Sequence, residues 1–272
     1  PTINGVNLYQ NRANAAGATL VDGTHRKVNL NNEQHVTVHQ GGTSVEANWA
    51  LPSDFTLTSV SSYRWWNFTP RNDDGLDVSA FYNAGVSVED KQYSQEFRLA
   101  SPTGGFFDYV VGAYYFGSDL DNKSFTYYGP QADIWSGTPN GALNNINSVG
   151  DGHIKTDSFA LFAQGTWHLT ERLDFTAGIR GTYEEKNAWV TRDAPVGGTA
   201  VTGAAATARR GRAGAYDSGD LNQYSSSPSG LLNLSYRLTD DLLTYATLSH
   251  GEKSGGVNLA VGTAPVAGAD SL

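Results

Sequence analysis

The chain has 272 residues, a formal net charge of -9, and neither cysteine nor methionine. The acidic balance argues against nucleic acid as the main partner, because a nucleic-acid-binding face needs a surplus of Lys and Arg. No apolar run approaches the about 18 residues of a transmembrane helix, but β-barrel strands cross a bilayer with only about 10 residues. Hydrophobic residues make up 39% of the chain and aromatic residues 11%, which favours a sheet with one apolar and one wet face.

The predicted elements begin with a loop. Residues 1 to about 33 are rich in Asn, Gly and Ala and show no period. A strand is expected from about 35 to 51, and Gly41-Gly42 within it permits a bulge that resets the alternation of its side chains. A tight turn then leads into a second strand, at about 55 to 68.

The rest of the chain repeats this hairpin pattern three more times. Each hairpin joins two alternating strands by a short turn, and the four turns are expected near Pro52, Pro102, Thr170 and Thr239. Longer polar segments separate the hairpins and are expected to be loops, at about 69–88, 118–154 and 190–222. Such alternation of short and long connections indicates a sheet that crosses a membrane with one trimmed and one elaborated side.

The alternation of side chains assigns two faces to this sheet. Between Leu173 and Tyr183, apolar residues recur at every second position. Because Arg against hydrocarbon at the bilayer midplane costs about 2–4 kcal/mol, the polar set is expected to face the lumen. The apolar set, expected against lipid, is Phe55, Leu57, Val111, Leu161, Phe175, Ile179 and Leu234. The polar set, expected on the lumenal face, is Thr56, Arg64, Glu96, Arg98, Gln164, Thr166 and Arg180.

These patterns predict an all-β fold, a portion of an antiparallel transmembrane β-barrel of about eight strands with short periplasmic turns and long extracellular loops. The whole chain, 1–272, is expected to form one partial barrel domain. It opens at Pro1 without a signal peptide, so we expect an internal piece of a longer protein, with a mature secreted domain as the alternative. A closed eight-stranded barrel would fill its lumen with side chains, which the many Gly, Ser and Thr of the polar faces would do poorly.

No motif for catalysis or cofactor binding is present, neither a nucleophile elbow nor a phosphate-binding loop. We therefore expect no catalytic residue, no metal and no cofactor. Residues 72–77 (NDDGLD) resemble a calcium loop but lack its distal Glu, and are interpreted as a solvated loop. His35 and His39 share a strand face but lie about 13 Å apart, too far to bind one metal, and are interpreted as lumenal or loop-surface residues.

The candidate ligand-binding residues are aromatic and basic side chains of the second and third predicted loops: Tyr127, Tyr128, Trp135, Arg209, Arg210 and Arg212. The aromatic rings can stack on a ligand or pack among themselves. The guanidinium groups suit carboxylates and phosphates, or remain solvated. Recognition is expected on the long-loop side, because loops vary while the sheet supplies a rigid support.

Five segments carry a resemblance to a known family, which covers residues 34 to 258. They are 93–99 (YSQEFRL), 112–116 (GAYYF), 175–180 (FTAGIR), 245–247 (YAT) and 249–256 (SHGEKSGG). In this order and spacing they resemble the barrel of TonB-dependent outer-membrane receptors. The resemblance implies a 22-stranded barrel with a plugged lumen, placed among the lipids of the bacterial outer membrane. It also implies energised uptake through the TonB complex, which engages the plug, and loops that capture a small-molecule or metal-chelate substrate.

Ferric siderophores are the commonest substrates of such families, with cobalamin and sugars also known. The chain departs from the family pattern because it has no recognisable plug, no segment for engaging TonB and only about eight of the strands, so it resembles the middle of a receptor. Two alternatives stay open. One is a passive porin-like outer-membrane channel, and the other is a secreted all-β binding module, which solubility as a monomer without detergent would favour.

Overall fold

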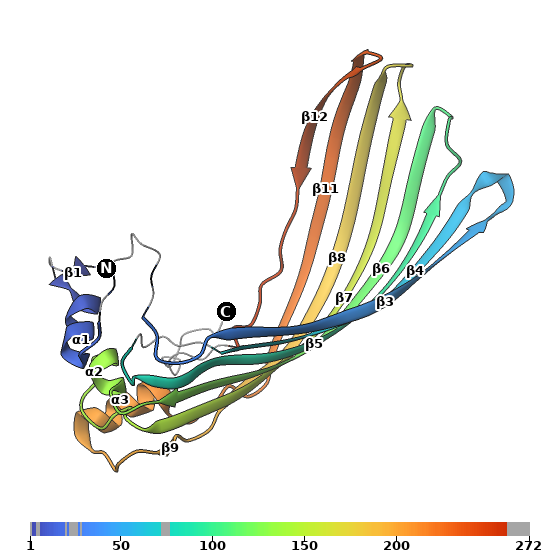
Figure 1. Cartoon of the computed structure of the whole chain (residues 1–272). Helices are drawn as coiled ribbons and strands as arrows, with labels where there is room; N and C mark the ends of the chain where they lie inside the picture. The colour runs from blue at the N-terminus through green and yellow to red at the C-terminus, as the bar shows by residue number, and fades with distance from the viewer. Residues whose placement is uncertain are drawn as a thin grey trace.

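The computed structural model describes residues 2–3, 6–19, 21, 27, 29–71 and 77–259. Its main feature is one antiparallel sheet whose eight main strands are neighbours in chain order (Figure 1). They are β3 (His35–Ala50), β4 (Thr56–Arg71), β5 (Phe81–Ala100), β6 (Phe107–Tyr128), β7 (Ile146–His168), β8 (Leu173–Arg192), β11 (Leu221–Thr239) and β12 (Leu242–His250). The predicted all-β, antiparallel sheet of about eight strands is confirmed.

Most strands are longer than the sequence pattern predicts. β3 has 16 residues and β7 has 23. β6 ends at Tyr128 and β7 begins at Ile146, so the prediction of a loop over 118–154 is wrong at both ends. The predicted loops over 69–88 and 190–222 are likewise too long, because β4, β5 and β8 extend into them. Backbone pairing continues into segments where apolar and polar residues no longer alternate, and there the two-residue period that marks a strand disappears.

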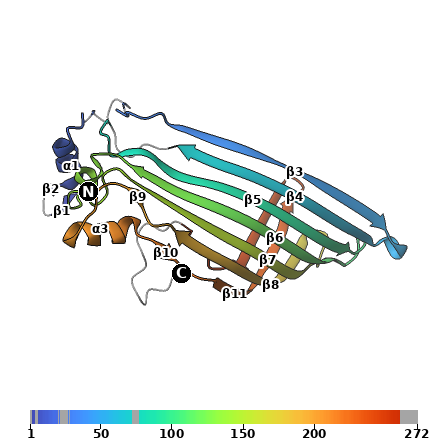
Figure 2. The same ribbon diagram turned by 90° about the horizontal axis from the view of Figure 1, so that it is seen from below.

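The two ends of the sheet differ. Short turns join the strands at the hairpin end, where the first turn contains the 3-10 turn η2 (Pro52–Asp54). Long connections and the helices α1, α2 and α3 gather at the other end (Figures 1 and 2). We call the connecting residues 6–19, 77–80, 129–145 and 193–220 the loop cap. It contains α1 (Leu8–Ala16), α2 (Ala132–Ser136) and α3 (Gly203–Ala213), with the two-residue strands β1 (Thr2–Ile3), β2 (Val6–Asn7), β9 (Val196–Gly197) and β10 (Tyr216–Asp217) in or beside it.

None of the helices in the described part of the chain has the length and apolar character to span a bilayer.

Strand pairing places the predicted apolar set on one face, which we call the outer face. Leu57 pairs with Leu99, Leu99 with Val111, Val111 with Ala163, and Ala163 with Ile179. Directly paired residues project to the same side of a sheet. The remaining members of the set lie on this face by pairing or ring contact, namely Phe55, Leu161, Phe175 and Leu234. The predicted polar set lies on the opposite, inner face, so the predicted division into two faces is confirmed.

The apolar face is the more exposed of the two. On the outer face Leu161 is 70% exposed and Ile179 is 67% exposed. On the inner face of the same sheet Thr156 is 8% exposed and Ser158 is 6% exposed. A sheet of a water-soluble protein shows the reverse, because burial of apolar surface drives its folding. The inverted arrangement fits a sheet whose outer face meets hydrocarbon.

Aromatic side chains form two belts on the outer face. In or next to four strands, two aromatic residues stand eight positions apart: Phe55 and Tyr63, Phe107 and Tyr115, Phe159 and Trp167, Phe175 and Tyr183. Rings of one belt touch across strands, with centroids 4.6 Å apart for Phe107 and Trp167 and 4.9 Å for Tyr115 and Phe159. Eight residues of a strand tilted by about 40° rise by about 20 Å, close to the apolar band of a membrane barrel.

The expected bulge at Gly41-Gly42 is wrong. β3 pairs with β4 without a shift from His35 to Ala50, so His35, His39 and Val45 share the outer face. The two glycines serve close packing instead. A Cβ on Gly41 would lie 3.0 Å from the Trp65 ring, and one on Gly42 would lie 2.7 Å from a backbone oxygen. His35 and His39 are exposed near the cap end of β3 rather than lumenal.

The loop cap has a small hydrophobic core of its own. Its main cluster is Ala132, Ala142, Leu143, Ile146 and Ala213, drawn from three parts of the chain. A second cluster joins Ala16 of α1 to Val78 and Ala80 before β5. Asp133 holds the 129–145 connection together, since its carboxylate accepts hydrogen bonds from the backbone N–H groups of Gly141 and Leu143, both at 2.7 Å. The cap is thus an ordered layer on the end of the sheet.

Candidate ligand-binding surface

The inner face of the sheet carries hydrogen-bonded polar side chains. Asp90 on β5 is 4% exposed, yet its carboxylate is fully satisfied. It accepts hydrogen bonds from Trp66 Nε1 at 2.9 Å, Gln92 Nε2 at 2.7 Å and Ser118 Oγ at 2.8 Å. Because these donors come from β4, β5 and β6, the cluster joins three strands, and a buried carboxylate needs such partners.

Arg180 on β8 lies among aromatic rings of the inner face. Its guanidinium carbon is 5.3 Å from the ring centroid of Tyr114 and 5.9 Å from that of Phe162, distances at which rings attract cations. Its Nε donates to Thr182 Oγ1 at 3.2 Å. Gly112 makes room for this arrangement, because a Cβ there would lie 2.3 Å from the Phe162 ring.

A recess of 640 Å³ opens beside Arg180 on the inner face, and its lining includes Glu96, Arg98 and His250. Glu96 pairs with Arg98 at 2.9 Å. No carboxylate of the described residues forms an ion pair with Arg180. The recess therefore has a basic surplus, which suits an anionic group.

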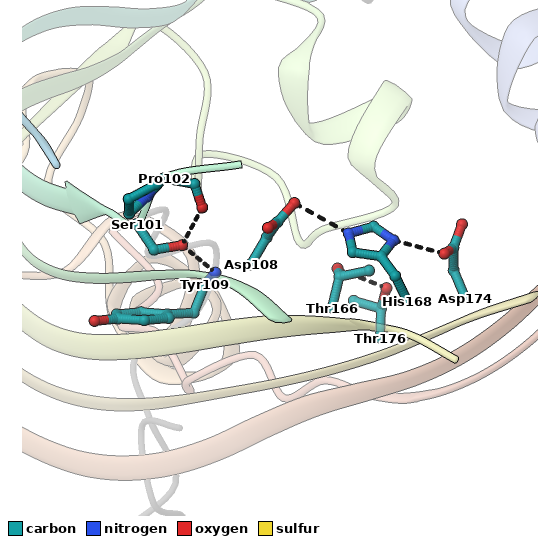
Figure 3. Close-up of polar contacts among 8 residues, drawn as sticks. All are labelled: Ser101, Pro102, Asp108, Tyr109, Thr166, His168, Asp174 and Thr176. Atoms are coloured by element: carbon teal, nitrogen blue, oxygen red, sulfur yellow. Dashed lines mark hydrogen bonds and ion pairs between the residues drawn. The ribbon is translucent and has the colours of Figure 1, made fainter. Parts of the chain in front are cut away.

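His168 connects three strands at the hairpin end (Figure 3). Its Nδ1 lies 2.7 Å from Asp174 Oδ1 on β8, and its Nε2 lies 3.0 Å from Asp108 Oδ2 on β6. A ring protonated at both nitrogens donates to both carboxylates. Beside it, the hydroxyl groups of Thr166 and Thr176 are 2.9 Å apart. This cluster joins β6, β7 and β8 at the hairpin end of the sheet.

The three aromatic candidates lie at the junction of sheet and loop cap. Tyr127 and Tyr128 are the last residues of β6, at its cap end, rather than part of a loop, which corrects their predicted setting. Tyr127 stacks on Phe125 with centroids 5.8 Å apart. Tyr128 packs against the main cap cluster and Trp135 against the second cluster. Burial raises the pKa of the Tyr128 phenol, and the guanidinium groups of Arg212 and Arg192 oppose that rise.

The three arginine candidates all lie on α3, but their surroundings differ. Arg209 is half-buried and donates to three carbonyl groups, those of Gly141, Ala142 and Thr199. Arg210 and Arg212 are exposed, and among the described residues the Arg210 guanidinium makes only a 3.4 Å contact, from Nη2 to Thr207 Oγ1. Arg209 thus ties the third connection to the second, whereas Arg210 and Arg212 present charge at the cap surface.

The helix α3 and the buried Arg192 were not among the features expected from the sequence. Residues 203–213 (GAAATARRGRA) consist mainly of Ala and Arg, which are strong helix formers, so a propensity signal was available. Arg192, 6% exposed at the end of β8, donates from Nε to the carbonyl of Gly214 at 2.6 Å and from Nη1 to that of Arg212 at 3.1 Å. No local signal marks those partners, which lie about 20 residues further along the chain.

The calcium-loop resemblance falls mostly on residues 72–76, which lie outside the described residues. Asp77, its last member, accepts hydrogen bonds from the backbone N–H of Thr19 at 3.0 Å and from Asn29 Nδ2 at 2.7 Å. Its carboxylate therefore attaches the segment before β3 to the loop cap.

The described residues contain one group of three metal-ligand side chains whose donor atoms converge, namely Asp119, Asp121 and His153 on the outer face. Elsewhere the inner face and the loop cap offer donors, cations and rings suited to binding.

A protein-family comparison matches residues 2–271 to the model for "TonB dependent receptor-like, beta-barrel". No curated protein matches the sequence. Among solved structures, the ferric yersiniabactin uptake receptor FyuA from Yersinia pestis superposes with a TM-score of 0.66 and 17% identity over 89% of this chain and 32% of that one.

The ferric-catecholate import receptor Fiu from E. coli K12 is also similar. Its open form gives a TM-score of 0.53 with 14% identity over 81% of this chain and 36% of that one. Its closed form gives 0.53 and 14%, with 34% of that chain covered. At these identities the likeness concerns the fold, and the chain spans about a third of the length of these receptors.

Proposed function

We propose, from the premise that this chain belongs to the TonB dependent receptor-like β-barrel family, that it forms part of the wall and the ligand-capturing loops of a receptor in the bacterial outer membrane. The receptor takes up a scarce nutrient such as a ferric siderophore, driven by the TonB complex through a plug domain. Members of this family are transport receptors rather than enzymes. The observation that carries the proposal is the family match over 2–271 on a sheet with inverted polarity.

The polarity of the wall supports a place in the outer membrane. The two aromatic belts bound a strip that holds Val111, Leu161 and Ile179, all exposed. In water such an apolar surface favours association with other proteins. In a membrane the hydrocarbon chains of the lipids cover it instead. Charged residues between the belts, such as Arg98 and Arg180, stay on the inner face, where a plug or water meets them.

The loop cap supports a role in capture of a ligand. Arg210 and Arg212 present guanidinium groups at its surface, where they suit the carboxylates or phenolates of an anionic chelate. Arg209, Tyr128 and Trp135 hold the cap in shape through carbonyl hydrogen bonds and packing. We assign ligand contact first to Arg210 and Arg212 and expect Tyr127, at the rim, to contribute less.

The test is uptake and binding by the receptor that carries this barrel portion. A deletion strain grown on defined iron and carbon sources identifies the substrate through the source on which growth fails. In the complemented strain, replacing residues 130–144 by a short turn removes α2 while β6 and β7 remain. We expect substrate binding to weaken and the barrel to remain folded.

A matched variant shortens the hairpin turn at 102–106 on the opposite end of the sheet and is expected to leave binding unchanged. Unchanged affinity after removal of the 130–144 and 194–219 connections would refute capture by the loop cap. Uptake that continues without the TonB complex would instead support the passive channel.

A further inference from the structure

Three side chains on the outer face converge although they lie outside the apolar strip. Asp119 and Asp121 stand two residues apart on β6, and His153 stands on β7 directly opposite Asp121. The three project to one side of the sheet, and their potential ligand atoms all lie within 4.8 Å of one another. The cluster therefore joins two neighbouring strands.

Distances within the cluster show that both carboxylates approach the same imidazole nitrogen. His153 Nδ1 is 2.9 Å from Asp121 Oδ1 and 3.9 Å from Asp119 Oδ1. One Nδ1–H serves the first oxygen as a hydrogen bond and leaves the second too far for one. A cation with bonds of about 2.1 Å sets neighbouring ligand atoms about 3.0–3.4 Å apart. The 2.9 Å distance to Asp121 already lies close to that range, and the 3.9 Å distance to Asp119 lies somewhat above it.

His168 provides a contrast within the same sheet. It also has two aspartates, but each faces a different ring nitrogen, Asp174 at Nδ1 and Asp108 at Nε2. A bridge through opposite sides of the ring suits an imidazolium with two ion pairs and leaves no shared position for a cation. At His153 the donors surround one point instead.

The surroundings hold the His153 ring and leave the cluster accessible. The ring stacks on Trp189 of β8 with centroids 6.2 Å apart and an interplanar angle of 19°. Its side chain is 25% exposed, and those of Asp119 and Asp121 are 49% and 65% exposed. A cation can therefore enter from outside the sheet without rearrangement of the strands.

The charges around the cluster do not neutralise it. On the paired positions, Glu89 of β5 stands opposite Asp121, while Lys91 of β5 and Lys155 of β7 stand opposite Asp119. Lys155 Nζ lies 3.8 Å from Asp157, so part of its charge is already matched. With Asp157 counted, four carboxylates and two ammonium groups share this patch, which leaves room for an added cation.

The cluster lies beyond the apolar strip, in the part of the sheet that water surrounds. Asp119 lies four residues and His153 six residues beyond the aromatic residues Tyr115 and Phe159 of their strands, in the direction of the loop cap. That places the donors roughly 10–15 Å outside the apolar strip.

We propose that Asp119, Asp121 and His153 form a binding site for a divalent transition-metal cation on the outer wall, separate from the ligand-capturing loops. One imidazole and two carboxylates suit Zn²⁺ or Co²⁺ better than Mg²⁺ or Ca²⁺, which prefer oxygen ligands alone. Three protein ligands leave at least one position of the cation for water. The site links β6 to β7 where the sheet leaves the membrane, and it does not depend on the transport proposal.

The experiment is titration of the purified, detergent-solubilised receptor with Zn²⁺ by calorimetry, repeated with Co²⁺ while its visible absorption is recorded. The wild-type protein and the variants His153→Ala, Asp119→Asn and His168→Ala are compared. Heat-dependent migration on gels checks that each variant is folded. We expect one Zn²⁺ equivalent whose affinity falls at least about tenfold in His153→Ala and in Asp119→Asn, and unchanged affinity in His168→Ala.

His153→Gln covers the case in which His153→Ala fails to fold, because it retains the size of the side chain and removes the imidazole. Saturable Zn²⁺ binding that all the His153 and Asp119 variants retain would overturn the proposal. Absence of saturable binding in the wild type would overturn it as well, and would leave the cluster as an ion pair. Tighter binding of Ca²⁺ than of Zn²⁺ would contradict the assigned cation class.

Discussion

The part of the sheet between the two aromatic belts, which we call the wall, faces lipid, whereas the loop cap faces water. In the wall, Leu161 and Ile179 are 70% and 67% exposed while polar Ser158 is 6% exposed. In the cap the order is reversed, since Leu143 is fully buried and Arg210 and Arg212 are exposed. The boundary is crossed within single strands, because β6 and β7 run from the apolar strip into the cap. The exposed side chains at each position along a strand therefore indicate whether lipid or water surrounds that part of the strand.

The largest expected effect concerns the core of the cap. Leu143→Ala empties a fully buried position and should destabilise the cap by about 2–5 kcal/mol. The comparison predicts that the loss stays local, so amide hydrogen exchange should accelerate over 129–145 and remain slow in β7 and β8. A matched Leu161→Ala change on the outer face, where no such core exists, should leave exchange in the cap unaltered. Equal loss of protection throughout the sheet would show that wall and cap are one cooperative unit.

The next effect concerns the outer face of the wall. Ile179→Arg introduces a charge midway between Phe175 and Tyr183 and should cost about 2–4 kcal/mol of folding free energy in a bilayer. Gln164→Arg, one residue pair away on the inner face, should cost clearly less. Urea titrations of both variants in lipid vesicles measure the difference. Similar costs for the two changes would contradict the assignment of the faces.

A smaller effect is expected where a glycine permits close packing on the inner face. Gly112→Ala places a Cβ 2.3 Å from the Phe162 ring and 2.7 Å from a backbone oxygen, and such overpacking costs about 1–3 kcal/mol. Gly181→Ala, where nothing lies within 4 Å of the added Cβ, is the control and should be near neutral. The same vesicle titrations compare the two, and equal stabilities would show that Phe162 moves aside freely.

The fold was predictable from the sequence where one face of a strand meets lipid and the other meets the lumen, because apolar and polar residues then alternate. It was less predictable elsewhere. The alternation from Leu173 to Tyr183 revealed β8 because lipid and lumen select different side chains. Beyond Tyr183 the strand continues to Arg192, but residues 184–187 (EEKN) are all polar and the period is lost. Gly41-Gly42 suggested a bulge, although the tight contact with Trp65 explains the glycines. A glycine permits a bulge without requiring one.

The candidate ligand-binding surface was predictable only in outline. The loops were expected at the correct end of the sheet, and α3 carries the three arginines that drew attention. Which of them is free depends on partners remote in sequence, since Arg209 bonds to Gly141 and Ala142 more than 60 positions away. Local composition shows that a charged side chain is present. It does not show whether a backbone carbonyl group from another part of the chain already accepts its hydrogen bonds.

The central claim is that lipid covers the outer face between the two aromatic belts, and labelling along β7 tests it most directly. These 272 residues contain no cysteine, so single cysteines can be placed at each position from 151 to 168 in a receptor freed of any cysteine elsewhere, in vesicles. Between Phe159 and Trp167, labels at odd positions should be quenched by lipid-borne quenchers and labels at even positions should not. Towards residue 151, quenching by lipid should cease at odd and even positions alike. Loss of the two-residue alternation between the belts, or quenching at the even positions, would contradict the account.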